Sequence, residues 1–375
     1  RQESNTALDR ALPHWQYSGS DNTKWAVGSH PKMISSNTTV DFIDFPHRHV
    51  AVSPHQQKLR LVEGLANGGA IDYYLIGRLD NHEDKSGYEG IKEVFAYHAA
   101  HEEDYRALES KAGILLLKPS ESQGEYKGWF RFLLESHQLF DVCVVEAATQ
   151  ISWDRYKAIV APDARYISDE LAAKLDAFVQ GGGVLVASGQ SGFYDGDYEK
   201  RKAPGLKSLG IREVEAIRGD LRGAYFKLSG EEQKLLPHFG VTSLVYLDGE
   251  YVFAGYGDKV KGYLKLLPPQ PFGPPERCYA LNPVVDRPGF VVNSYGKGKT
   301  LLSAYPLESY LALTPGAFDA PESTHHLYRA FYEWGGIKTL FRTDQPQVEA
   351  AGLVGKEHGY AILANHSPQD HRVVV

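Results

Sequence analysis

The sequence has 375 residues, of which 42% are hydrophobic and 23% charged, a composition typical of a folded protein with two or three domains. Its net charge of −7 provides no basic surface for phosphates, so we expect no nucleic-acid partner. No apolar run reaches the roughly 18 residues of a membrane span, so we expect no membrane partner. The two cysteines, Cys143 and Cys278, form no metal-binding pattern, and their scarcity favours a reducing cytoplasm, while export gains no support.

Residues 1–108 combine polar, aromatic-rich loops with alternating strands and helices. The pattern predicts a helix over residues 56–66, a buried strand over 71–76 and a long helix with a solvated charged face over 89–108. Strands that alternate with helices in this way are typical of an α/β barrel.

Residues 109–340 begin with a buried strand and then repeat strand and helix. The most regular part predicts a strand over 158–161, a helix over 169–180 and a second strand over 184–187. Ser168 is a suitable N-terminal cap for that helix, and a triple glycine ends it. This is one unit of a doubly wound parallel sheet. Similar patterns predict a strand at 113–119, a helix at 128–137 and a strand at 142–145.

The chain then becomes richer in glycine and proline. Residues 202–288 predict short strands in an irregular insertion or small β subregion, and residues 290–306 predict a hairpin across a Gly-Lys-Gly turn. A last helix is expected over 325–335. After it, the pattern from about Gln347 predicts the first strands of a small β domain.

Three stretches of the sequence resemble family 42 glycoside hydrolases, in the order in which that family has them. SWDRYKAIVAPDARYISDELAAKLDAFVQGGGVLVASG, residues 152–189, resembles the family's trimerisation domain, a flavodoxin-like module. LRLVEGLANGGAIDYYLIGRLD, residues 59–80, resembles the last helix and strand of its catalytic barrel. GYAILANHSPQDHRVVV, residues 359–375, resembles the start of its C-terminal β domain. The chain is thus similar to this family or to a related glycosyl hydrolase family.

The resemblance implies an α/β fold in three parts. These are the C-terminal portion of a (β/α)8 barrel at 1–108, a flavodoxin-like, class I amidotransferase-like domain at 109–340 with its insertion at about 202–288, and the start of a β domain at 341–375. A complete barrel takes about 250 residues, so we expect a fragment that lacks the N-terminal part of the barrel. The implied activity is β-galactosidase-like hydrolysis of a carbohydrate by a bacterial-type homotrimer.

Glycoside hydrolysis uses two carboxyl groups, which in a barrel lie at the carboxyl ends of strands. In the family that this chain resembles, the acid comes from the fourth strand, which would precede Arg1, and the nucleophile from the seventh. The closest match to the seventh strand, residues 49–56, has Ala51 at the nucleophile position. We therefore expect either catalysis by another carboxylate or a noncatalytic carbohydrate-binding or scaffold protein that has lost the family nucleophile.

Asp41 and Asp44 are the nearest replacements, because they follow a run of β-branched and aromatic residues that predicts a strand end. Asp44 is the preferred catalytic residue and Asp80 the second candidate. The alternative role for Asp44 is to cap the turn before Pro46.

The loop after the last barrel strand contains several groups that could bind a sugar. Arg78 corresponds to the arginine that closes this strand in the family, and its fork of donors can hold a carboxylate or a hydroxyl. We expect Asn81 and His82 to contact neighbouring hydroxyls. The alternative is a solvated loop with an internal pair between Arg78 and Asp80.

Aromatic and histidine side chains complete the expected substrate contacts. Trp15 and Tyr17 stand beside amide and carboxylate groups, a mixture that suits sugar rings, although such aromatics also staple loops. His49 is included as a substrate contact. It lies close to His47 and His55, but no companion carboxylate spacing is present, so we expect no metal.

The flavodoxin-like module suggests two further activities, and the sequence argues against both. Gly181–Gly183 follow a helix instead of opening one, so they do not form a dinucleotide-binding loop. No cysteine follows the strand at 184–187, so an amidotransferase nucleophile is absent there. We therefore expect no cofactor, and a noncatalytic module that packs against the barrel or a neighbouring subunit.

Overall fold

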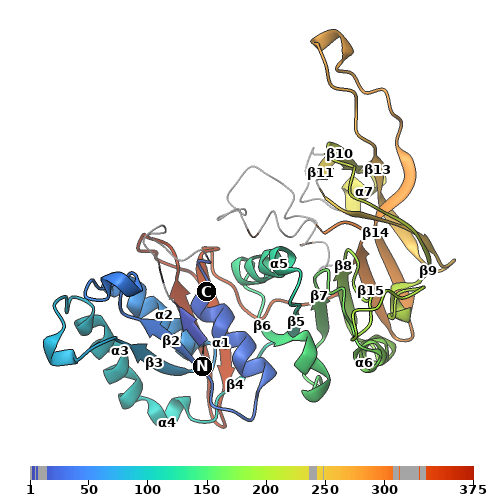
Figure 1. Cartoon of the computed structure of the whole chain (residues 1–375). Coiled ribbons are helices and arrows are strands. Elements are labelled where there is room, and N and C mark those ends of the chain that lie inside the picture. Colours follow the sequence, from blue (N-terminus) through green and yellow to red (C-terminus); the bar gives the residue numbers. More distant parts are fainter. Residues whose placement is uncertain are drawn as a thin grey trace. The chain divides into compact units, whose positions relative to one another are not determined.

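The structure is a computed structural model that describes residues 2–4, 6, 15–235, 243–247, 249–306, 312, 329 and 335–375. The chain forms two compact units, and the boundary between them crosses helix α5 (Gln123–Glu135) and strand β6 (Phe140–Val144) (Figure 1). The first unit contains residues 1–113, 133–143 and 339–375, and the second contains residues 114–132 and 144–338.

The predicted helix over 325–335 lies almost entirely outside the described residues. The predicted domain boundaries at 108 and 340 stay predictions.

The first unit begins with strands and helices in alternation. Its parallel sheet has the order β1-β2-β3, and Val40 at the end of β2 pairs with Tyr74 at the end of β3. The elements are, in chain order, β1 (Gln2–Ser4), α1 (Ser18–Ser29), β2 (Ser36–Val40), α2 (Pro54–Ala66), β3 (Ala70–Tyr74) and α3 (Tyr88–Ala100). Leu61 and Leu65 of α2 pack against Ile91 and Val94 of α3 in a buried cluster. The alternation is as predicted, and its place in a barrel stays a prediction.

Two expectations for this region are corrected. The long helix predicted over 89–108 is interrupted at His101, and a short helix α4 (Glu102–Tyr105) follows α3. Three acids begin α4, where they interact favourably with a helix N-terminus, whereas at the end of one long helix they would oppose its dipole.

The strand expected within residues 49–56 does not form either. Ser53 caps α2 and Pro54 occupies its first turn, so this segment already enters the helix. Ala51 pairs with Phe42 in an isolated bridge, and its amide donates to Asp84 at 2.9 Å. The strand that precedes α2 is β2, and the first residue after it is Asp41. Ala51 therefore does not occupy the strand end at which a catalytic carboxylate was expected.

The last described part of the chain belongs to the first unit. Strands β16 (Val348–Val354) and β17 (Gly359–Asn365) form an antiparallel hairpin, as the sequence predicts. Strand β16 also pairs with β4 (Glu109–Ser110), which directly follows the α4 region. The final strands are thus hydrogen-bonded to a segment more than 200 residues earlier in the chain.

The second unit contains the doubly wound core that the sequence predicts. Strands β5 (Ile114–Lys118), β7 (Ala158–Ala161), β8 (Val184–Ser188) and β15 (Gly298–Ser303) are parallel neighbours in that order. Helix α6 (Asp169–Gln180) has the predicted bounds, and α5 (Gln123–Glu135) begins five residues earlier than predicted. All residues of β7 and β8 are buried, which explains their continuous apolar sequences.

The region predicted to form short strands in an irregular insertion or small β subregion contains several strands among its described residues. Strands β10 (Ala224–Lys227), β11 (Leu244–Leu247), β13 (Lys261–Leu267) and β14 (Val285–Tyr295) extend the main sheet as antiparallel strands. Within this unit the order is β11-β10-β13-β14-β15-β8-β7-β5. Strands β9 (Ile211–Arg218) and β12 (Tyr251–Tyr256) form a separate pair. None of the described helices has the length and apolar character needed to cross a membrane.

The N-terminal cap of α6 provides a test of the second unit. The Ser168 hydroxyl accepts a hydrogen bond of 3.2 Å from the Leu171 amide. We expect Ser168→Ala to lower the free energy of unfolding by about 1 kcal/mol, because the amide loses its partner. Ser168→Asp keeps an accepting oxygen and should restore most of this loss. Urea unfolding of the three proteins measures the effect, and equal stability of Ser168→Ala and the parent would contradict it.

Candidate functional site

The predicted catalytic and sugar-binding residues lie after two neighbouring parallel strands. Asp41 and Asp44 follow β2, and the loop at residues 78–84 follows β3. Because β2 and β3 are parallel neighbours, their carboxyl ends meet at one edge of the sheet (Figure 1). In open α/β sheets and in barrels this edge is where ligands bind.

Asp41 is the buried centre of this edge. The Gln57 side-chain amide donates a hydrogen bond of 3.1 Å to Oδ1, and the Tyr73 hydroxyl donates another to the same oxygen. Nε2 of His82 lies 3.1 Å from the other oxygen, Oδ2. Burial and the bond to Asp41 raise the pKa of Tyr73, so its hydroxyl remains a donor. Asp41 therefore ties the ends of β2 and β3 to α2 and to the loop at 78–84.

The two predicted catalytic acids are more accessible than Asp41. Asp44 accepts a hydrogen bond of 2.7 Å from the Phe45 amide and caps a short 3-10 helix, η1 (Phe45–His47). Asp80 forms a two-bond pair with the exposed Arg78, in which Nε lies 2.9 Å from Oδ1. Both alternative roles, a turn cap and an internal ion pair, are thus present. The catalytic roles of Asp44 and Asp80 stay predictions.

The remaining predicted contacts of this loop differ in exposure. Asn81 is exposed, and its backbone amide donates to the Arg78 carbonyl at 3.1 Å. His82 is buried beside Asp41, whereas His49 is exposed, and the two imidazole rings lie 4.9 Å apart between centroids. The segment between β2 and α2 thus brings His49 to the same place as the loop after β3.

Trp15 and Tyr17 lie in a different part of the first unit. Tyr17 has no exposed surface, its hydroxyl donates to Glu135 at 2.7 Å, and Trp15 is 7% exposed. The Tyr17 ring stands edge-on to Trp15 and to His366, with centroids 5.4 and 4.7 Å away. Both rings are packed in the core, so a sugar could reach either one only after the surrounding residues moved.

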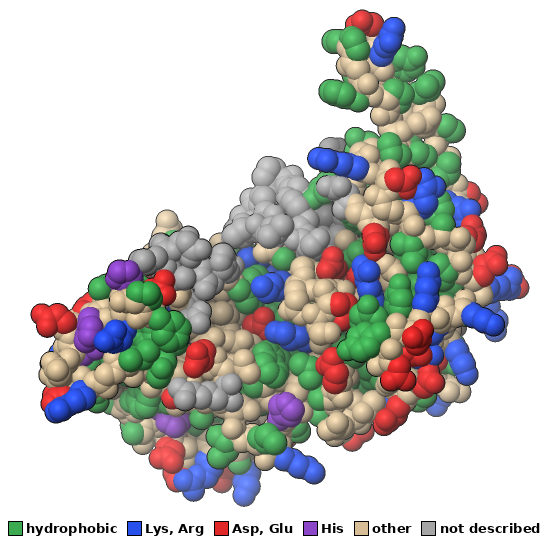
Figure 2. Space-filling view, in the orientation of Figure 1, with side chains coloured by type: hydrophobic (Ala, Val, Ile, Leu, Met, Phe, Trp, Pro, Cys, Tyr) green, Lys and Arg blue, Asp and Glu red, His purple; other side chains and the backbone are tan. Residues whose placement is uncertain are grey.

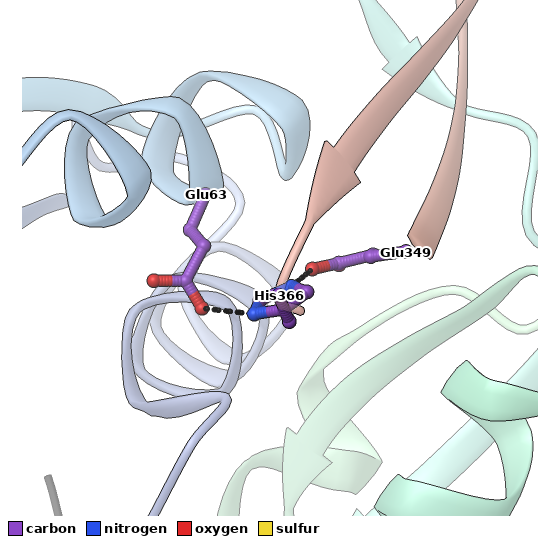
Figure 3. Close-up of side chains that lie close together, drawn as sticks. All are labelled: Glu63, Glu349 and His366. Atoms are coloured by element: carbon purple, nitrogen blue, oxygen red, sulfur yellow. Dashed lines mark hydrogen bonds and ion pairs between the residues drawn. The ribbon is translucent and has the colours of Figure 1, made fainter. Parts of the chain in front are cut away.

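Close to Tyr17 is a buried ionisable cluster that the sequence analysis missed. Glu63 on α2, Glu349 on β16 and His366 after β17 have almost no exposed side-chain surface (Figure 3). Nε2 of His366 lies 2.9 Å from Glu349, and Nδ1 lies 3.9 Å from Glu63. The one available signal was a glutamate at position 63 between the apolar residues Leu61 and Leu65 of a predicted helix.

Helix α1 supplies further partners to this cluster. The Ser20 hydroxyl donates to Glu349 at 2.5 Å, and its backbone amide donates to Glu63 at 3.2 Å. Asn67, which follows α2, also donates to Glu349 at 3.2 Å. Gly19 has no room for a side chain, because a Cβ atom there would lie 2.3 Å from an oxygen of Glu63. The close contact between Glu63 and helix α1 therefore depends on a glycine at residue 19.

The protonation states follow from burial and from these contacts. Burial raises the pKa of Glu63 to about 7. Burial also acts to raise the pKa of Glu349, but the hydrogen bond and charge of His366 outweigh it and lower this pKa to about 2. Burial opposes protonation of His366, yet the bond to Glu349 and the charge of Glu63 raise its pKa. These shifts favour an imidazolium on His366 bound to the Glu349 carboxylate.

Among the described residues, these three form one group whose ligand atoms all lie within 4.8 Å of one another, as a metal site would require. The two ring nitrogens of His366 face different carboxylates, as Figure 3 shows. A protonated ring has a hydrogen on each nitrogen and can interact with both carboxylates, whereas one metal ion would take only one ring nitrogen. The geometry therefore favours a protonated histidine as the bridging group.

Glu63 gives this cluster a pH dependence with a definite sign. Because its pKa in the folded protein, about 7, is above the ordinary 4.5, the folded state binds this proton more tightly, and stability falls as pH rises from 4.5 to 7. In Glu63→Gln the side chain at residue 63 cannot ionise, so we expect the free energy of unfolding of this variant to fall less than that of the parent over this interval. The difference should be up to roughly 3 kcal/mol, because a difference of one pKa unit corresponds to about 1.4 kcal/mol.

Urea unfolding at pH 5, 6, 7 and 8 measures this difference. Glu89→Gln is the matched control, because Glu89 is an exposed glutamate on a neighbouring helix that pairs only with Lys92 among the described ion pairs. The control should follow the pH profile of the parent protein. Parallel profiles for all three proteins would show that Glu63 does not titrate in this range.

Comparison with known proteins gives the family context of the chain. Residues 101–214 match the family model of the beta-galactosidase trimerisation domain. No protein of curated function matches the sequence. The resemblance to family 42 glycoside hydrolases that residues 152–189 predict is therefore confirmed for this part of the chain.

Solved structures share the fold over most of this chain. An α-L-fucosidase, isoenzyme 2, from Paenibacillus thiaminolyticus is 18% identical with a TM-score of 0.67, covering 94% of this chain and 52% of its own. A β-galactosidase from Bacillus circulans sp. alkalophilus is 14% identical with a TM-score of 0.69, covering 96% and 53%. A β-galactosidase from Rahnella sp. R3 is 14% identical with a TM-score of 0.70, covering 97% and 55%. The chain thus spans about half the length of these relatives.

Proposed function

We propose that the protein containing this chain is a glycosidase-like enzyme that hydrolyses the glycosidic bond of a carbohydrate, with a β-galactoside as the first candidate substrate. The observation that carries the proposal is the group of acids after β2 and β3, at the carboxyl edge of a parallel sheet. Glycoside hydrolysis uses two carboxyl groups, and the carboxyl edge is where barrel enzymes place them. A shared fold with an α-L-fucosidase and two β-galactosidases supports this proposal.

The acids of this edge have different tasks in the proposed site. Asp44 and Asp80 are the candidate catalytic carboxylates, because their side chains are not sealed in the core. Asp41 is fully buried and bonded to Tyr73 and Gln57, so it acts as a positioning residue that fixes the strand ends. His82 acts through its contact with Asp41.

Exposed donors around these acids suit sugar hydroxyls. Arg78 holds Asp80 through two of its donors and has further donors for a hydroxyl. Asn81 is exposed on the same loop, and the exposed His49 lies beside His82; both complete the proposed polar contacts. Trp15 and Tyr17 are not included in this site, because both are buried elsewhere in the unit.

The arrangement of the whole protein forms part of the same proposal. Residues 1–108 would supply the last strands of a (β/α)8 barrel, and the doubly wound sheet of the second unit would be the flavodoxin-like assembly module. The description of the family that residues 101–214 match supports a homotrimer. The sugar site and the assembly module are then separate parts of the chain.

Substitution of the two acids tests the proposed chemistry. In the gene product that contains this chain, we expect Asp44→Asn and Asp80→Asn each to lower kcat/KM by about 10²- to 10⁴-fold, the usual effect of losing a catalytic acid or base. Asparagine retains the capping ability of residue 44, and an exposed ion pair at residue 80 contributes only about 0–1 kcal/mol, so both variants should fold. Aryl β-galactosides and aryl α-L-fucosides are the probe substrates.

Glu83→Gln is the matched control, because Glu83 is an exposed acid of the same loop, and its activity should equal that of the parent. Unchanged turnover in both aspartate variants would remove them from the mechanism. Calorimetric binding of the sugar without any turnover by the parent would favour the noncatalytic carbohydrate-binding alternative.

A further inference from the structure

An exposed apolar arm extends from the main sheet of the second unit. Residues 268–284, called the arm here, connect β13 to β14 and project beyond them (Figure 1). Phe272 is 98% exposed, and hydrophobic side chains continue along the arm (Figure 2). The other large exposed apolar residues of the arm are Tyr279, Leu281 and Val284. Single exposed apolar residues are common, but a run of them on one projecting segment is typical of an interaction site.

The arm is held in shape by its own hydrogen bonds. The Gln270 side chain donates to the carbonyls of Pro268 and Asn282 at 2.9 and 3.1 Å. Its oxygen accepts from the amides of Leu281 and Asn282 at 2.8 and 2.9 Å. Gln270 thus joins the outgoing and returning halves of the arm near its base.

Prolines and a second set of contacts order the tip. Five of the eight residues in 268–275 are proline, which restricts the backbone. At the tip, Cys278 contacts the amide and the carbonyl of Gly273 at 3.2 and 2.8 Å. An arm that is ordered before it binds loses less conformational entropy on association.

The chemistry of the arm suits an apolar partner surface. Glu276 and Arg277 are its only charged residues, so they contribute no net charge. Aromatic anchors such as Phe272 and Tyr279 dominate the binding energy of protein interfaces when a partner pocket receives them. Nucleic acids and membranes with anionic headgroups would instead select for basic residues.

We propose that the arm docks on a second copy of this chain and is one of the contacts that hold the assembly together. The proposal rests on the proposed homo-oligomer, because the family description that matches residues 101–214 names an assembly of copies. The arm is rigidly connected to that module. Strand β14 pairs with β15 from Phe290 to Tyr295, and β15 pairs with β8 inside the doubly wound core.

Phe272→Ser tests the arm, with Tyr198→Ser as the matched control. Tyr198 is also an exposed aromatic residue of the second unit, but it lies outside the arm and is 65% exposed. We expect the parent gene product to sediment as an oligomer, and Phe272→Ser to raise the dissociation constant at least about 30-fold, the effect of losing an interface anchor. Tyr198→Ser should sediment like the parent.

Labelling of Cys278 distinguishes the possible occupants of the surface. Cys278 is exposed in this chain and Cys143 is buried, so the rate of maleimide modification at Cys278, read by peptide mass spectrometry, reports on the arm. We expect slow labelling in the oligomer and fast labelling after dilution or in Phe272→Ser. Slow labelling that does not change with concentration would place another part of the same polypeptide on the arm and overturn the proposal.

The two proposals fail in different ways. A parent protein that is monomeric at every concentration would remove the homo-oligomer and the docking arm together. An oligomer that keeps its affinity and its Cys278 labelling rate in Phe272→Ser would overturn the arm alone. Neither result bears on turnover, which depends on the acids of the first unit.

Discussion

A buried histidine between two glutamates joins the end of the chain to its beginning. His366 follows β17 and lies between Glu349 of β16 and Glu63 of α2, and Ser20 of α1 binds both carboxylates. Charges at this depth are costly unless they are paired, and loss of one partner leaves the others uncompensated. The position of the final hairpin in the first unit therefore depends on this bridge, and Gly19 is small because the bridge needs the space.

The second unit is organised by hydrogen bonding along one continuous sheet. Its buried parallel centre, from β5 to β15, arises from the alternation of strands and helices. Strand β14 then returns antiparallel to β15, and the glycine- and proline-rich insertion adds further strands to the same sheet. Because the insertion is paired to the core, the projecting arm has a fixed base.

The carboxyl edge of β2 and β3 combines a rigid interior with accessible acids. Asp41 shares its two oxygens among three side chains and is sealed from solvent, whereas Asp44 and Asp80 remain at the surface of the edge. A fixed support beneath accessible carboxylates is what a site for bond cleavage requires. Arg78 and Asn81 are exposed on the loop after β3, where we propose that they contact a sugar.

The sequence by itself determined the elements whose causes are local. The cap at Ser168 and the buried runs around it predict α6 and β7 with the bounds that the structure has, because caps and hydrophobic periodicity act over a few residues. It also indicated that acids follow two strands. Only the tertiary structure decided that Asp41 is buried, that Tyr17 packs against His366, and that β16 and β17 join the first unit. These outcomes depend on contacts between residues far apart in the chain, and no local pattern records which distant residues will meet.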